Sequence, residues 1–86
     1  MFSITFVNPF DVSVQVEIRA GSEQNCDQNG TVFSDALGPN ASWTLNTGEN
    51  VVCYRRTADP AVSGGPFNEW GTFSPDSINT PANIQL

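Results

Sequence analysis

A regular alternation of apolar and polar residues near the N-terminus constrains the fold of this chain most strongly. Between positions 12 and 19 every second residue is apolar and β-branched: Val12, Val14, Val16 and Ile18. Successive side chains of an extended strand point to opposite faces, so this period of two predicts a strand with one buried face and one face in water. A similar alternation over residues 2–6 predicts a second strand.

The segment Asn8-Pro9-Phe10-Asp11 separates these two runs. This is a cluster of turn-forming residues, and proline is favoured early in tight turns because its φ angle is already fixed there. We therefore predict that residues 2–19 form an antiparallel β-hairpin.

The remainder of the chain contains more short strand signals and no helical periodicity. Further strands are predicted at residues 31–34 or 33–37, 42–46, 51–56 and 82–86, with Thr47–Asn50 as a second hairpin turn. Residues 70–74 either form another short strand or belong to a segment that wraps the sheet and is pinned by its aromatic residues. Five to seven short strands separated by turn signals, with essentially no helix, fit a small antiparallel β-sandwich or an open barrel. We predict one all-β domain over residues 1–86.

One stretch carries a resemblance to a known architecture. The run Leu37-Gly38-Pro39-Asn40-Ala41-Ser42, followed by an alternating strand and by Gly48-Glu49, is similar to turns in many immunoglobulin-like sandwiches. The resemblance covers about 20 residues and implies the fold class alone.

The charge balance argues against several kinds of partner. Nine carboxylates face three arginines, with no lysine and no histidine, and the net charge is −6. Such a chain lacks the clustered cations that bind nucleic acid or an anionic membrane surface. Its first ten residues have neither the positive start nor the long apolar core of a signal peptide, and its localisation stays open.

The residue types also argue against catalysis, so we predict no enzyme activity, no cofactor and no metal site. Without histidine the commonest general base and the Ser-His-Asp device are missing. The run Asp27-Gln28-Asn29-Gly30-Thr31 spaces oxygen atoms as some calcium loops do, but it lacks the closing glutamate. These residues are also ordinary turn formers, and the turn is the favoured interpretation.

Cys26 and Cys53 are the only cysteines. A bridge between them would stabilise a small domain by about 3–4 kcal/mol through loop closure. Two free thiols, with Cys53 as a small buried residue, are the alternative, and the sequence leaves the choice open.

The candidate contact residues lie from residue 54 onward, where the chain becomes rich in proline and glycine. They are Tyr54, Arg55, Arg56, Phe67 and Trp70. Arginine and large aromatic residues are the side chains most enriched where proteins bind proteins. On a strand Arg55 and Arg56 point to opposite faces, and one of them is expected to pair with Asp59 or another carboxylate.

Two functions fit these features. The first is a non-enzymatic protein-interaction module, such as a subunit of an assembly, a self-associating chain or a small inhibitor of another protein. The second is a carbohydrate-binding module, because exposed Trp70 or Tyr54 beside Asn, Asp and Thr residues suits the stacking and hydrogen bonding of sugars.

Overall fold

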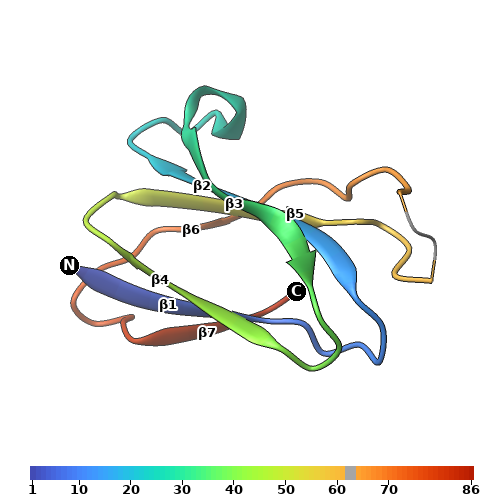
Figure 1. The fold of residues 1–86 in the computed structure, drawn as a ribbon. Coiled ribbons are helices and arrows are strands. Elements are labelled where there is room, and N and C mark those ends of the chain that lie inside the picture. Colours follow the sequence, from blue (N-terminus) through green and yellow to red (C-terminus); the bar gives the residue numbers. More distant parts are fainter. Residues whose placement is uncertain (62–63) are drawn as a thin grey trace.

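The computed structural model describes residues 1–61 and 64–86 and folds them into a β-sandwich (Figure 1). The strands, in chain order, are β1 (Phe2–Val7), β2 (Val14–Gly21), β3 (Gly30–Leu37), β4 (Ser42–Thr47), β5 (Val51–Arg56), β6 (Gly71–Phe73) and β7 (Ala82–Gln85). Within the described residues, one turn of 3-10 helix at Cys26–Gln28 is the only helical segment. The all-β prediction is confirmed, and every predicted strand overlaps an observed one.

The strands form two sheets, and this decides between the sandwich and the barrel. Sheet A has the order β4-β1-β7, and sheet B has the order β3-β2-β5-β6. All strand pairs are antiparallel except β1 and β7, which run parallel. The expectation of a purely antiparallel arrangement is wrong for that pair. These two strands are far apart in sequence, so the chain between them can make the long crossover that parallel pairing requires.

The predicted N-terminal hairpin is wrong, although both of its strands exist. β1 pairs with β4 and β7 in sheet A, whereas β2 pairs with β3 and β5 in sheet B. The segment between them therefore crosses from one sheet to the other. Alternation reports which face of a strand is buried, and both strands do bury one face, but it carries no information about the neighbouring strand.

Asn8 explains why the chain crosses at this point. Its side chain is fully buried, and Nδ2 donates hydrogen bonds to the backbone carbonyls of Val12, Leu37 and Gly38 at 2.9–3.0 Å. Its Oδ1 accepts from the Phe10 amide at 2.9 Å. One carboxamide thus satisfies backbone groups from both the crossing segment and the end of β3, as buried polar groups require.

Two smaller expectations also fail, because the segments concerned connect the two sheets. Thr47–Asn50 connects β4 in sheet A with β5 in sheet B, so it is not a hairpin turn. Val12 was expected to share the buried face of β2, but the strand begins at Val14 and Val12 is 44% exposed. Both segments belong to connections between the sheets.

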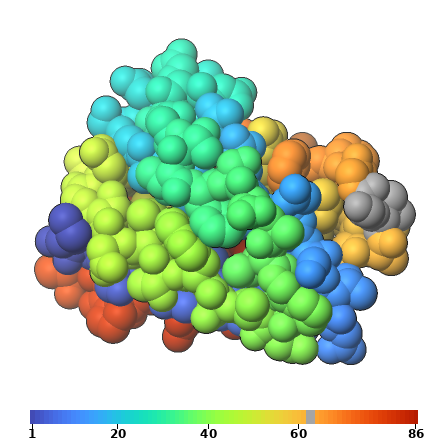
Figure 2. Space-filling view, in the orientation of Figure 1, coloured from blue at the N-terminus to red at the C-terminus, as the bar shows by residue number. Residues whose placement is uncertain are grey.

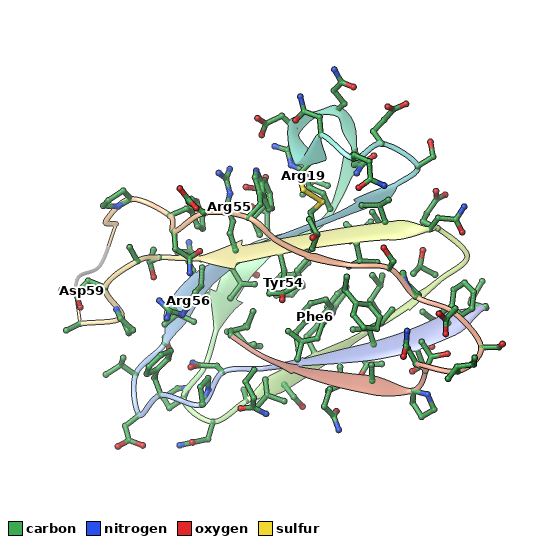
Figure 3. The ribbon with its side chains drawn as sticks, turned by 180° about the vertical axis from the view of Figure 1, so that it is seen from behind. Phe6, Arg19, Tyr54, Arg55, Arg56 and Asp59 are labelled. Carbon is green, nitrogen blue, oxygen red and sulfur yellow. A yellow bond between two sulfur atoms is a disulfide. The ribbon has the colours of Figure 1, made fainter. Side chains whose placement is uncertain are left out.

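The inner faces of the two sheets form the main core. Its buried members are Ile4, Phe6, Val14, Val16, Ile18, Leu37, Leu45 and Val52. Figure 3 shows Phe6 and Tyr54 between the sheets, where their ring centres lie 5.6 Å apart. Because alternate residues of β2 and β5 fill this core, the residues between them are directed to the outer face of sheet B. No helix among the described residues is long and apolar enough to cross a membrane.

Candidate functional site

The outer face of sheet B carries a glutamate between two arginines. Glu17 and Arg19 alternate with the core residues of β2, and Arg55 lies opposite Glu17 in the register of β2 and β5. Arg55 Nε donates to Glu17 Oε1 at 2.8 Å, and Arg19 Nε donates to Glu17 Oε2 at 3.0 Å. Each carboxylate oxygen of Glu17 is therefore bound to a different arginine.

The environment of Glu17 favours its charged form. Its side chain is only 11% exposed. This burial raises the pKa, but the hydrogen bonds from Arg55 and Arg19, together with their positive charges, outweigh it and hold the pKa of Glu17 below its ordinary value. Glu17 thus compensates part of the positive charge that the two arginines bring to this face.

Two aromatic side chains lie against these arginines. The guanidinium carbon of Arg55 is 4.1 Å from the ring centre of Trp70 and 4.7 Å from that of Phe67. The corresponding carbon of Arg19 is 5.6 Å from Trp70. These distances are in the range of cation–π attraction. We refer to Glu17, Arg19, Arg55, Phe67 and Trp70 as the aromatic–arginine cluster.

Backbone hydrogen bonds hold the segment that supplies the aromatic residues. Asn68 donates from its amide to the Arg56 carbonyl at 2.8 Å, and its Oδ1 accepts from the Arg56 amide at 3.0 Å. Thr57 and Phe67 form an isolated β-bridge. The proline- and glycine-rich stretch therefore continues the edge of β5 before forming β6, and it is pinned by its aromatic residues. Residues 62 and 63 of this stretch lie outside the described residues.

A disulfide packs against the Trp70 ring of the cluster. Cys26 and Cys53 are bonded, with their Cα atoms 5.8 Å apart, which answers the question the sequence left open. Trp70 packs against a second small core formed by these two residues and Val51. Trp70 Nε1 also donates to Asp27 Oδ1 at 3.3 Å, so the ring is tied to the loop between β2 and β3. That loop projects from the body of the sandwich (Figure 2).

In the segment that resembles a calcium loop, Asp27 and Gln28 lie in the 3-10 turn, and Gly30 and Thr31 begin β3. The Asp27 side chain is engaged by Trp70, and Asn29 is turned inward, where it bonds both backbone groups of Glu23. In the described part of the chain, no group of three or more His, Cys, Asp or Glu side chains gathers in a way that could hold a metal ion.

Tyr54 and Arg56 lie on the opposite face of β5 from Arg55, as alternation predicts (Figure 3). Tyr54 packs against the main core, and the Arg56 guanidinium lies 4.8 Å from the centre of the Phe10 ring. Both nevertheless line an open cavity of about 210 Å³ together with Trp70. The other lining residues are Asn68, Glu69, Gly71, Gln85 and Leu86.

The five predicted contact residues are therefore divided into two adjoining groups that share Trp70. On the outer face Arg55 lies against both Trp70 and Phe67, whereas Tyr54 and Arg56 line the cavity with Trp70. The expected pairing of an arginine with a carboxylate exists, but Glu17 is the partner. Asp59 instead accepts a hydrogen bond from the backbone amide of Ala61.

Sequence reasoning missed Glu17, Arg19 and Asp27 as members of the site. Glu17 and Arg19 share one face of a predicted strand, and this was the available signal. Their meeting with Arg55 depends on the register between β2 and β5, and alternation does not define it. No protein-family model, curated protein or solved structure matches this chain.

Proposed function

We propose that this protein is a non-enzymatic interaction module that binds another protein through the aromatic–arginine cluster. The observation that carries the proposal is the position of Phe67. The residue remains 38% exposed while its ring centre lies 4.7 Å from the guanidinium carbon of Arg55. A large apolar side chain held in this way at the surface is the kind of anchor that a partner's pocket can accept.

The contacts that the cluster residues make within the chain favour binding. Phe67 is held by the β-bridge to Thr57, and Trp70 is held by Arg55, Arg19 and Asp27. Binding normally costs about 0.5–1.5 kcal/mol for each flexible side chain that becomes immobile. Here much of that ordering is already present in the free protein.

The charges of the cluster indicate the kind of partner. Both arginines are paired with the Glu17 carboxylate, and Arg19 also donates to backbone carbonyls of Asp27 and Asn29. Glu17 compensates one of these two positive charges, and the chain as a whole carries a net charge of −6, which repels an acidic surface. A protein surface with an apolar pocket, and with polar groups around it, complements this arrangement best.

A purely structural role for the cluster is the alternative. In that case Phe67 and Trp70 would do no more than cover the disulfide and its small core. Affinity capture from an extract of the source organism distinguishes the binding role from the structural role. Phe67→Ala should lose a partner that both the wild type and Ile78→Ala retain, since Ile78 is 90% exposed in the β6–β7 connection. Equal capture by all three proteins would refute the proposal.

A further inference from the structure

We propose that the cavity between β5, the 68–71 segment and the end of β7 binds one neutral sugar residue. This site adjoins the proposed protein-binding surface and shares Trp70 with it, but Phe67 and Arg55 do not line it. Its volume of about 210 Å³ is below the roughly 300–1,000 Å³ of pockets for drug-sized ligands, so it suits a single ring.

The lining offers the hydrogen-bonding groups that sugars use. Asn68 and Gln85 bring carboxamides, Glu69 brings a carboxylate and Tyr54 brings a hydroxyl. Within residues 1–61 and 64–86, the hydroxyl of Tyr54 and the side chains of Glu69 and Gln85 make no hydrogen bond to the protein, and Asn68 uses only its Oδ1. These groups come from three separate segments and remain available to hydroxyls of a ligand.

Two aromatic rings complete the cavity. Apolar C–H faces of sugars pack against aromatic side chains, and the lining contains two such residues, Tyr54 and Trp70. The Tyr54 ring is positioned by Gly71, where a Cβ atom would lie 2.5 Å from two of the ring carbons. Glycine at this position lets the ring lie directly on the backbone of β6.

The charges favour a neutral sugar over an acidic one. Within the lining, the Arg56 guanidinium and the Glu69 carboxylate balance each other. Arg56 already donates from Nη1 to the carbonyls of Thr57 and Ala58. A chain with net charge −6 also repels anionic ligands. Neutral hydroxyls, which both donate and accept, match this balanced lining better than a uronate.

The test is a titration of the folded protein with neutral methyl hexosides, in which binding is monitored through the amide chemical shifts. At least one of them should bind with a dissociation constant in the millimolar range and shift residues 54, 68–71 and 85. Glu69→Gln replaces a charged acceptor with a weaker neutral one, and Gln85→Ala removes a carboxamide, so each should weaken that binding about fivefold or more. Tyr54→Phe, which removes only a hydroxyl, provides an independent variant that retains the packed ring. Glu49→Gln is the matched control, since Glu49 is an exposed carboxylate outside the cavity.

Three results would overturn the proposal: no shift with any neutral hexoside, unchanged affinity in the cavity variants, or tighter binding of a uronate than of its neutral parent. Phe67→Ala should bind the sugar as the wild type does, because Phe67 lies outside the cavity. Sugar binding and protein binding can therefore fail independently of each other.

Discussion

Arg55 on β5 lies directly opposite Glu17 on β2, with its Nε 2.8 Å from a Glu17 carboxylate oxygen. Glu17 also binds Arg19, so this one carboxylate positions both guanidinium groups that lie against Trp70. Cross-strand pairing thereby positions the guanidinium groups against which the half-buried Trp70 and the exposed Phe67 lie.

The first prediction concerns Glu17 and pH. The lowered pKa of the folded Glu17 means that, around this pKa, the unfolded chain binds more protons than the folded one. The stabilisation that the charged Glu17 provides is therefore complete above the pKa of about 4.3 that a glutamate has in the unfolded chain. It is lost as the pH falls through the lower pKa of the folded state. Glu17→Gln should reduce the free energy of unfolding by about 1–3 kcal/mol at pH 7, with a smaller difference at pH 3.

Denaturant unfolding at both pH values measures this difference. Glu49→Gln serves as the control, because Glu49 is exposed in the β4–β5 connection. A Glu17→Gln deficit of the same size at pH 3 and pH 7 would contradict the assignment of the stabilisation to the charged carboxylate.

The second prediction concerns the disulfide. Cys26 and Cys53 are 27 positions apart, and opening a loop of this length should cost about 3–4 kcal/mol in the chain-entropy account. The double variant Cys26→Ser, Cys53→Ser should unfold at correspondingly lower denaturant concentration than the oxidised wild type. A thiol titration of the unfolded wild type without reductant should find no free thiol. Two free thiols would show that the bridge is absent.

The third prediction concerns Asn8. Asn8→Ala removes the donor that three buried or partly buried carbonyls share, and we expect a loss of about 2–4 kcal/mol of unfolding free energy. Asn46→Ala, at an exposed position of β4, should change stability by less than about 0.5 kcal/mol. Similar stabilities for the two variants would mean that Asn8 does not hold the crossing between the sheets.

These results show which parts of the fold alternation can predict. The runs containing Ile4 and Val16 identify strands and their buried faces, because burial of one face imposes the period of two. The pairing of the strands could not be predicted from the sequence. Asn8 and its neighbours resemble a tight turn whether the chain reverses within one sheet or crosses to the other sheet. The buried bonds of Asn8 become visible only when β3 is in place.

In the candidate site, too, the local sequence predicts residue types and strand faces but not contacts between distant residues. Arg55, Phe67 and Trp70 were identified by residue type, and alternation correctly separated Arg55 from Arg56. The partner of Arg55 could not be identified, because Glu17 is 38 positions away and meets it only through strand register. The bridge from Cys26 to Cys53 was undecided for the same reason.

The fourth prediction distinguishes the packing role of Trp70 from the partner-binding role proposed for Phe67. Trp70 packs on the disulfide core, so Trp70→Ala should lower the free energy of unfolding by about 2–4 kcal/mol. Phe67 is more exposed, and Phe67→Ala should cost less than about 1 kcal/mol. Thermal and denaturant unfolding of both variants measure this. A Phe67→Ala loss as large as that of Trp70→Ala would indicate that Phe67 is primarily a packing residue.

The affinity of the captured partner for the wild type, Phe67→Ala and Ile78→Ala tests the central claim most directly. Isothermal titration should show at least tenfold weaker binding by Phe67→Ala, which corresponds to about 1.4 kcal/mol, and unchanged binding by Ile78→Ala. Wild-type affinity in Phe67→Ala, with the fold intact, would contradict the claim that the aromatic–arginine cluster is the contact surface.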